Sequence, residues 1–403
     1  MPKPLSDIRV LELGQLIAGP FAAKILAEFG AEVIKVEPPK TGDPLRKWRL
    51  LHKGTSVWWA VQSRNKQSLA LDLRQKEAQD IIKQLITECD VLIENFKPGT
   101  LEQWGLGWAD LEKINPKLIM LRVSGYGQTG PYKDRPGFGL VGEAMGGLRH
   151  LSGEPGRAPV RVGISIGDSL SALHGVIGVL LALRQRDKDG LGQYIDVALY
   201  ESVFNMMESL LPEYSVFNEI RQPAGSALPG ITPSNAYLSK DNKYALIAGN
   251  GDSIFQRLAQ AMNRPDLAQN PLYAHNDGRA QHASEIDQAI AQWASRYTLD
   301  ELLQILHEHR VPAGRVYDIE DIYHDPHYQA RNMIVQTELD DGTPVAVPGV
   351  VPKLSRTPGE INSKAPRLGQ HTTQILSELG IDAATQQKLL EAGIIDAENL
   401  KKD

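Results

Sequence analysis

An aspartate, Asp168, stands where a strand-like run of small residues, 163–167, gives way to the apolar segment 170–183, which the sequence predicts as a buried helix. A carboxylate at that point aims its oxygens at free backbone N–H groups, which is the ordinary geometry of a helix N-cap. The same geometry would hold an anionic nucleophile, and the neighbouring glycines would leave room for a bulky substrate. The segment by itself favours the cap, so the rest of the chain has to decide between the two interpretations.

A glycine-rich turn, 13–20, follows the first predicted strand. Such turns place a pyrophosphate on a helix N-terminus in dinucleotide-binding proteins, and Glu37 ends the next strand about where an acid would bind the ribose. The spacing does not complete this fingerprint, because four residues separate Gly14 from Gly19 and Pro20 follows. A structural turn explains much of the segment. A dehydrogenase or nucleotide-binding module therefore stays a distant alternative.

Three adjacent residues, Asn95, Phe96 and Lys97, follow the predicted strand 91–94. Ligands of open α/β sheets gather at the carboxyl ends of the strands, and an amide, an aromatic face and a cation together suit a nucleotide-like group. A polar turn closed by the Pro-Gly pair at 98–99 is the simpler explanation of these residues alone.

Two further glycine loops follow predicted strands. The loop 124–131 has glycines that permit close backbone approach, and a loop at this edge of a sheet is more often a binding loop than a purely structural one. Gly249, Asn250 and Gly251 form either a flexible lid or a tight turn, since Asn-Gly is a strong turn signal.

Other kinds of catalytic centre find no support in the sequence. The histidine pairs at 307 and 309 and at 324 and 327 lack a third ligand at the usual spacing, so we expect no metal site. We find no Gly-x-Ser-x-Gly elbow and no Walker-type loop.

The composition of the chain limits its possible binding partners and its cellular compartment. A formal net charge of -6, with no basic block interleaved with aromatics, argues against nucleic acid. The single cysteine, Cys89, excludes an internal disulfide and suggests a reducing compartment. The chain begins with no charged-then-apolar leader, and the apolar run 170–183 is too short to span a membrane. We therefore expect a cytoplasmic protein without membrane partners.

Strands and helices alternate in the first third of the chain, which predicts a parallel sheet covered on both faces and hence an α/β fold. The predicted strands of this part are 8–13, 32–37, 91–94 and 118–123, with helices at 20–29 and 75–89. The segment 190–199 is predicted to be a turn followed by a strand, and a helix at 201–211 comes next. The smaller α+β part has a strand at 244–248 and helices at 253–262, 284–295 and 299–309. The chain shows little regular pattern after 316 and ends in helices at 372–379 and 383–392.

In order along nearly the whole chain, these segments resemble the class III coenzyme A transferases, the family of formyl-CoA transferase and carnitine CoA-transferase. Each motif is weak alone, but the ordered set is highly specific. The motifs are Leu11-Glu-Leu-Gly14 with Ala18-Gly-Pro20, 30–38, Gly42-Asp-Pro44, Asn65-Lys66 with Ser68, 94–99, 125–131, Pro159-Val-Arg-Val-Gly163, Gly192-Gln with Asp196-Val-Ala-Leu199, Val311-Pro-Ala-Gly314, Asp325-Pro-His with Gln329-Ala-Arg331, and Leu368-Gly-Gln-His-Thr372.

The resemblance implies that Asp168 is a covalent nucleophile and that a CoA thioester is a substrate, with no tightly bound cofactor. It further implies CoA contacts at Leu16, Ala18, Leu71, Arg74, Asn95, Phe96, Lys97, Gln103 and Trp104. It makes residues 249–251 a mobile substrate loop. It also implies an interlocked homodimer in which both ends of the chain belong to the large domain. Together with the sequence pattern, this predicts a Rossmann-like large domain (1–211), a linker (212–235), a small domain (236–318) and a return to the large domain (319–403).

Two departures from the family pattern bear on the substrate. Ile17 stands where formyl-CoA transferase has a glutamine, and Phe138-Gly139 stands where it has a Tyr-Glu pair, so formate and oxalate are doubtful substrates. Related α-methylacyl-CoA racemases carry a proton-transferring His-Asp pair at the latter place. We expect transfer of CoA from a donor such as succinyl-CoA to a small, dicarboxylic acid. A racemase-type acyl-CoA enzyme is the alternative.

Overall fold

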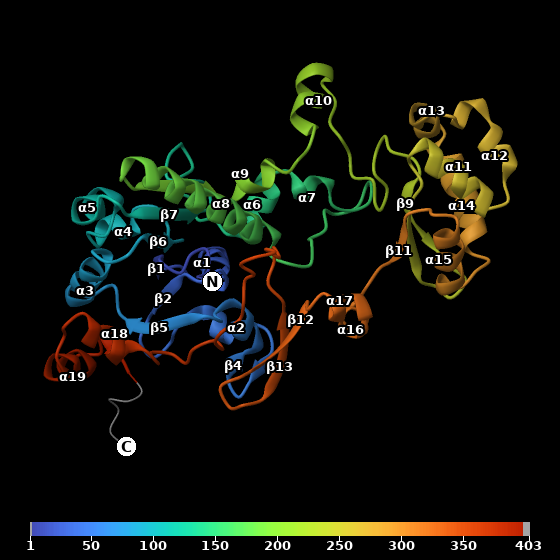
Figure 1. Ribbon diagram of the computed structural model, residues 1–403. Coiled ribbons are helices and arrows are strands. Elements are labelled where there is room, and N and C mark those ends of the chain that lie inside the picture. Colours follow the sequence, from blue (N-terminus) through green and yellow to red (C-terminus); the bar gives the residue numbers. More distant parts are fainter. Residues whose placement is uncertain (1, 398–403) are drawn as a thin grey trace. The chain divides into compact units, whose positions relative to one another are not determined.

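The strands predicted for the first half of the chain lie in one seven-stranded sheet, in the order β14-β5-β2-β1-β6-β7-β8, in the computed structural model of the chain (Figure 1). The structure describes residues 2–397. All neighbouring strands pair in parallel except β14, which is antiparallel to β5. This confirms the expected α/β class. The strands are β1 (Arg9–Glu12), β2 (Glu32–Glu37), β5 (Lys66–Leu71), β6 (Val91–Glu94), β7 (Ile119–Ser124), β8 (Gln193–Ala198) and β14 (Ile395–Asp396).

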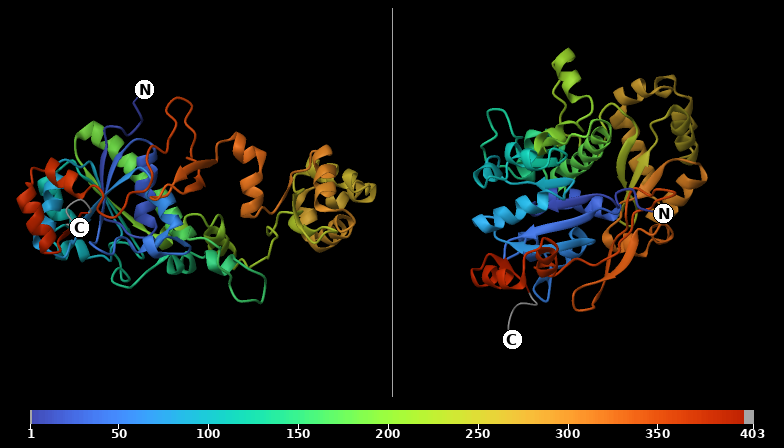
Figure 2. Two further views of the ribbon diagram at one scale, coloured as in Figure 1. Left: turned by 90° about the horizontal axis from the view of Figure 1, so that it is seen from below. Right: turned by 60° about the vertical axis from the view of Figure 1, so that its left-hand side comes forward.

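Alternation along the strands divides the apolar core between the two faces of the sheet. In β1, Val10 belongs to the cluster with α1 and α8, while Leu11 belongs to the cluster with α3, α18 and α19. Figures 1 and 2 show these helices around the sheet. The helices of this part are α1 (Ala18–Glu28), α2 (Val57–Gln62), α3 (Lys76–Ile86), α4 (Thr100–Gln103), α5 (Trp108–Ile114), α6 (Gly139–Met145), α7 (Leu148–Leu151), α8 (Ile166–Asp189), α9 (Leu199–Phe204), α10 (Leu210–Phe217), α18 (Thr372–Glu378) and α19 (Ala383–Glu391).

The chain divides into two compact units. Among the described residues, the first unit comprises 2–149, 161–219 and 329–397, and the second comprises 150–160 and 220–328. The second unit has a three-stranded sheet of β9 (Ser234–Leu238), β10 (Tyr244–Ala248) and β11 (Ala313–Arg315). Its helices are α11 (Asp252–Ala261), α12 (Pro265–Gln269), α13 (Asn276–Gln281), α14 (Ala283–Ala294), α15 (Leu299–Glu308) and α16 (Ile319–His324).

Several elements differ from the sequence prediction. Strand β5 and the edge strand β14 were not predicted, and residues 212–217 of the expected linker belong to helix α10 (Leu210–Phe217). The stretch after 316 is more regular than expected, because it contains α16, α17 (Pro326–Ala330) and the hairpin of β12 (Ile334–Glu338) and β13 (Pro344–Pro348).

Helix α8 is longer than the predicted segment, and it begins before Asp168 rather than at it. The N-cap is Ser165, so Asp168 lies in the first helical turn and is not the cap. The small residues preceding the helix form no strand. By length and apolar composition, α8 is long enough to cross a bilayer, contrary to the expectation. Core helices pass the same test, and α8 packs against β7 and β8 of the sheet.

A buried charge cluster lies beneath the turn that follows β1. The Lys35 ammonium lies 2.9 Å from Glu12 and 2.8 Å from Asp43, and the Lys66 ammonium lies 2.7 Å from Glu12. The Asp43 carboxylate in turn accepts from the backbone N–H of Leu16 at 3.1 Å. The cluster thus ties β1, β2 and β5 to the turn at residue 16.

Replacing Lys35 by methionine is expected to destabilise the protein by about 3–5 kcal/mol, because two buried carboxylates lose a shared cation. Urea unfolding would measure this loss. Lys76→Met is the matched control, since it removes the same charge from an exposed pair with Asp80 and is expected to change stability little. Equal stability of the two variants would contradict a structural role of the cluster.

Candidate active site

A cavity of about 590 Å³ opens in the first unit at the carboxyl ends of the parallel strands. Its walls come from the turns after β1, β6 and β7 and from the first turns of α6 and α8. Ligands of open α/β sheets bind at this edge, because the strand-to-helix loops gather there. The cavity brings together six of the residues predicted from the sequence: Leu16, Ala18, Asn95, Phe96, Lys97 and Asp168.

Asp168 is partly buried against the first residue of α6. A Cβ atom added to Gly139 would lie 2.1 Å from Oδ2 of Asp168, a separation that real side chains do not adopt. Gly167 is also confined, because its added Cβ would lie 3.2 Å from the carbonyl oxygen of Gly139. The two glycines therefore let α6 and α8 approach closely enough to set the position of the carboxylate.

The environment of Asp168 raises the pKa of its carboxyl group above that of an exposed aspartate. Burial, reinforced by the negative charge of Glu143 and opposed by Arg161, raises the pKa of the Asp168 carboxyl to about 6. At pH 7 the carboxylate still outnumbers the acid by about ten to one. The group is therefore a more basic and stronger nucleophile than an exposed aspartate, and it is charged without the help of a general base.

Asn95 supports the cavity wall in a way that the sequence did not reveal. Its Oδ1 accepts from the backbone N–H of Gln15 at 2.7 Å, and its Nδ2 donates to the carbonyl of Gln15 at 2.8 Å. The Asn95 side-chain amide, which we expected to face a ligand, is thus hydrogen-bonded to the backbone of the turn after β1. That turn places Leu16 at a φ of 63°, which the bonds from Asn95 and Asp43 hold in place.

The remaining predicted CoA contacts and the predicted substrate loop do not line this cavity. Leu71 is buried in the core, and Arg74 is exposed and pairs with Asp72 at 2.8 Å. Gln103 ends α4, and the Trp104 ring that follows packs edge-on against Phe96 with centroids 5.5 Å apart. Gly249, Asn250 and Gly251 belong to the second unit, where the carbonyl of Asn250 accepts from the buried Arg279 at 2.6 Å.

Glu37 is unavailable for the ribose of a dinucleotide. Its two carboxylate oxygens accept from Arg46 at 2.7 and 2.9 Å and from Ser68 at 2.7 Å, and the residue is 1% exposed. The sequence alternative of a dinucleotide site at this strand therefore loses its acidic residue.

Comparison with known proteins identifies the family. A model described as CoA-transferase family III matches residues 5–372. The chain belongs to this family. It is 50% identical to succinyl-CoA–D-citramalate CoA-transferase of Chloroflexus aurantiacus, with 94% of each chain covered. It is 46% identical to the beta subunit of succinyl-CoA–L-malate CoA-transferase from the same organism, covering 93% of this chain and 94% of the relative. A CAIB/BAIF family protein from Brucella suis has the same fold, with a TM-score of 0.83, 32% identity and coverage of 94% and 100%.

The protein is therefore a class III CoA-transferase, as the ordered motifs implied. Sequence reasoning missed several residues that line the cavity of this CoA-transferase, among them Trp48, Arg49, Trp58, Arg135 and Arg161. Arg161 stood within one of the quoted motifs, so its position was visible but its chemistry was not considered. Glu143 carried no sequence signal, because its relevance comes only from the packing of α6 on α8.

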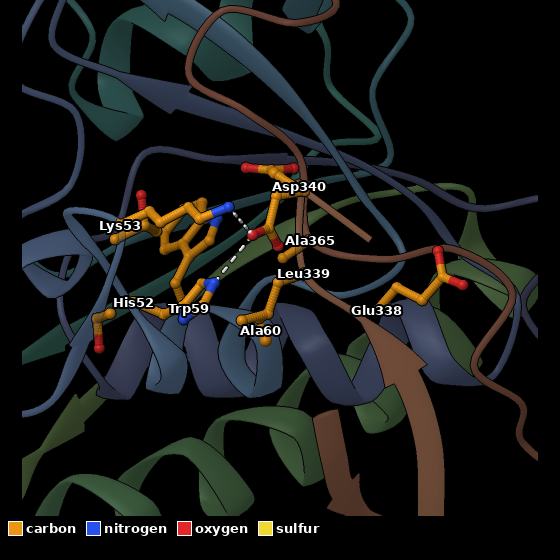
Figure 3. Close-up of a pocket in the computed structure, with 11 residues that line it drawn as sticks. His52, Lys53, Trp59, Ala60, Glu338, Leu339, Asp340 and Ala365 are labelled. Atoms are coloured by element: carbon orange, nitrogen blue, oxygen red, sulfur yellow. Dashed lines mark hydrogen bonds and ion pairs between the residues drawn. The ribbon is translucent and has the colours of Figure 1, made fainter. Parts of the chain in front are cut away.

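A second cavity of about 150 Å³ in the CoA-transferase lies between the hairpin of β3 (Leu51–His52) and β4 (Thr55–Ser56), α2 and the β12–β13 turn (Figure 3). Asp341 at its rim lies 2.7 Å from the Lys53 ammonium and 3.0 Å from the His52 ring, and these contacts hold the pKa of its carboxyl well below the usual range. This cavity is too small for CoA and shares no lining residue with the Asp168 cavity. Within residues 2–397, no group of three His, Cys, Asp or Glu side chains is arranged to hold a metal ion.

Proposed function

We propose that this CoA-transferase moves CoA from succinyl-CoA to a dicarboxylic acid through a covalent thioester on Asp168. The observation that carries the proposal is a nucleophilic carboxylate fixed by Gly139 at the wall of a large cavity that also holds cationic side chains. The names of the relatives in Chloroflexus aurantiacus support succinyl-CoA as donor and a C4 or C5 dicarboxylate as acceptor.

The reaction proceeds by two exchanges at the Asp168 carboxyl group. One carboxylate oxygen attacks the thioester carbonyl carbon of the donor and the C–S bond breaks. CoA leaves as the thiolate, and a mixed anhydride of Asp168 and the donor acid remains. The thiolate then attacks the Asp168 carbonyl carbon, which releases the donor acid as a carboxylate and leaves an aspartyl-CoA thioester. The acceptor carboxylate repeats both steps in reverse, and no net proton is consumed.

Positions for CoA follow from the cavity and from the family resemblance. Lys97 offers a cation for a phosphate, and Leu16 and Ala18 offer apolar contact at the turn after β1. Leu71, Arg74, Gln103 and Trp104 complete the proposed CoA contacts. The family resemblance makes Gly249, Asn250 and Gly251 a mobile substrate loop. Exclusion of water from the anhydride lets the acyl group pass to an acid instead of being hydrolysed. No tightly bound cofactor is required for these steps.

We extend the proposal to an interlocked homodimer in the cytoplasm. Helix α8 exposes an apolar stripe, Leu173, Ile177, Leu180 and Leu181, whose side chains are 44–67% exposed. Such a stripe on a core helix is typical of a surface covered by another chain. The buried Cys89 thiol, whose pKa is raised to about 12 by burial, suits a reducing compartment. Light scattering of the purified protein would measure the predicted dimeric mass.

Incubation of the protein with succinyl-CoA and a panel of acids tests the proposed function. We expect new acyl-CoA esters with citramalate, malate or glutarate, detected by mass spectrometry. The racemase alternative predicts exchange of α-deuterium without acyl transfer. Appearance of only the exchange product, or of neither product, would reject the proposed function.

The pH profile of kcat/KM for the donor is expected to fall on the acidic side with an apparent pKa near 6, because the protonated Asp168 carboxyl is not a nucleophile. Glu143→Gln removes one of the two causes of the raised pKa but leaves burial in place. In this variant the acidic limb of the profile should therefore move to lower pH, while the apparent pKa of Asp168 stays above that of an exposed aspartate. The 3′-phosphate of CoA titrates in the same pH range and contributes equally to both profiles. The test is therefore the difference between the pH profiles of the wild type and of Glu143→Gln, measured with the same donor. Identical acidic limbs in the two pH profiles would show that Glu143 does not raise the pKa of Asp168.

A further inference from the structure

Four cationic side chains line the Asp168 cavity: Arg49, Lys97, Arg135 and Arg161. Arg49 and Arg135 lie over aromatic rings, with the guanidinium carbon 5.4 and 3.7 Å from the ring centroid. Within the described part of the chain, the Lys97 and Arg161 side chains make no hydrogen bond. Lys97 follows β6, whereas Arg161 precedes α8 and lies 3.8 Å from Glu143, so these two cations come from different walls of the cavity.

Arg161 and Asp168 meet the same face of helix α6. Asp168 contacts Gly139, while the Arg161 Nη2 atom lies 3.8 Å from Oε1 of Glu143. Gly139 and Glu143 are one helical turn apart, and such positions are neighbours about 5–6 Å apart on a helix. The guanidinium of Arg161 therefore lies about one turn of α6 from the nucleophilic carboxylate.

Glu143 orients Arg161 without consuming its hydrogen-bond donors. The residue is fully buried, and its Oε2 accepts from the Arg149 Nε at 3.0 Å. Its Oε1 is buried and has no hydrogen-bond partner, since Arg161 stands beyond hydrogen-bond distance. A guanidinium that is held by charge but not by hydrogen bonds keeps its planar fork open for a ligand carboxylate.

We propose that Arg161 binds the distal carboxylate of the acid whose other carboxyl group reacts at Asp168, and that it thereby selects dicarboxylic acids. The inference rests on the proposed function. Three or four C–C bonds join the two carboxyl carbons of a C4 or C5 acid, which span about 4–5 Å. That span matches the separation of about one helical turn between Asp168 and Arg161, which both lie against α6. A monocarboxylic acid of the same length leaves Arg161 without its ligand.

The decisive experiment compares two acceptors of the same shape, isotope-labelled succinate and succinamate, in which an amide replaces the distal carboxylate. With saturating succinyl-CoA, kcat/KM for the acceptor reports the attack on the aspartyl-CoA thioester. The wild-type enzyme should prefer succinate. Arg161→Gln is expected to lower kcat/KM for succinate by about 10–100-fold and for succinamate by less than about threefold. Arg161→Lys keeps the positive charge but cannot bind a carboxylate through two parallel hydrogen bonds, so it should retain only part of the preference for succinate.

Arg135→Gln is the matched control, because it removes a guanidinium from the same cavity and should leave the preference for succinate unchanged. Arg161 is half exposed, and an unchanged thermal midpoint will confirm that its variants fold. Three outcomes would overturn the inference: Arg161→Gln keeps the preference for succinate, it loses activity equally with both acids, or Arg135→Gln loses the preference instead. Each of these outcomes would leave CoA transfer by the wild-type enzyme intact. Transfer to neither acid by the wild-type enzyme would reject the proposed function itself.

Discussion

Replacing Asp168 by alanine is expected to lower kcat for CoA transfer by at least about 10⁴-fold, because both covalent intermediates form on this carboxyl group. The affinity for CoA should change little, because the carboxylate contacts the acyl carbon and not the nucleotide. Steady-state assays with succinyl-CoA and calorimetry with CoA measure the two effects separately. The isosteric Asp168→Asn variant should show the same loss, since an amide is a poor nucleophile.

A labelling experiment identifies the reacting group directly. The wild-type enzyme incubated with succinyl-CoA alone should carry CoA on the peptide that contains Asp168, and hydroxylamine should release it. Asp187→Ala is the matched control, because Asp187 is an exposed aspartate on the same helix. It should retain full activity and labelling. Activity of Asp168→Ala near that of the wild type, or a label on another residue, would refute the nucleophile assignment.

Adding one methyl group at Gly139 is expected to lower kcat by about 100-fold, since a displacement of the nucleophile by about 1 Å has effects of this size. The added Cβ would overlap Oδ2 of Asp168 and lie 3.0 Å from its Cγ. The carboxylate or the start of α6 must therefore move. Alanine is otherwise a better helix former than glycine, so a loss of activity with a preserved thermal midpoint would point to misplacement of the nucleophile.

Gly163→Ala is the matched control for this substitution. Gly163 precedes Asp168 in the same segment, and a Cβ added there would meet no heavy atom within 4 Å. Its kcat should stay within about threefold of the wild type, since open space adds no steric strain. Full activity of Gly139→Ala would show that the position of the Asp168 carboxylate is not set by its contact with α6.

Strand β5 illustrates where the sequence alone fails. Its polar residues Lys66 and Ser68 break the apolar pattern on which strand prediction depends. In the fold they are buried, because Lys66 pairs with Glu12 on β1 and Ser68 donates to Glu37 on β2. Both partners are distant in the chain, so a local pattern could not reveal that these polar groups are satisfied in the interior.

The sequence by itself determined the α/β class, the order of most strands and helices, the family and the aspartate to examine, because these depend on local periodicity and on motifs contiguous in the chain. It also located six residues of one cavity, since the carboxyl ends of parallel strands share an edge. Only the tertiary structure decided that Asp168 lies within the first turn of α8 and not at its cap. The packing of α6 on α8 set Gly139 against the carboxylate, brought Glu143 and Arg161 beside it and raised its pKa. These properties depend on contacts between separate helices, which no single segment of the sequence encodes.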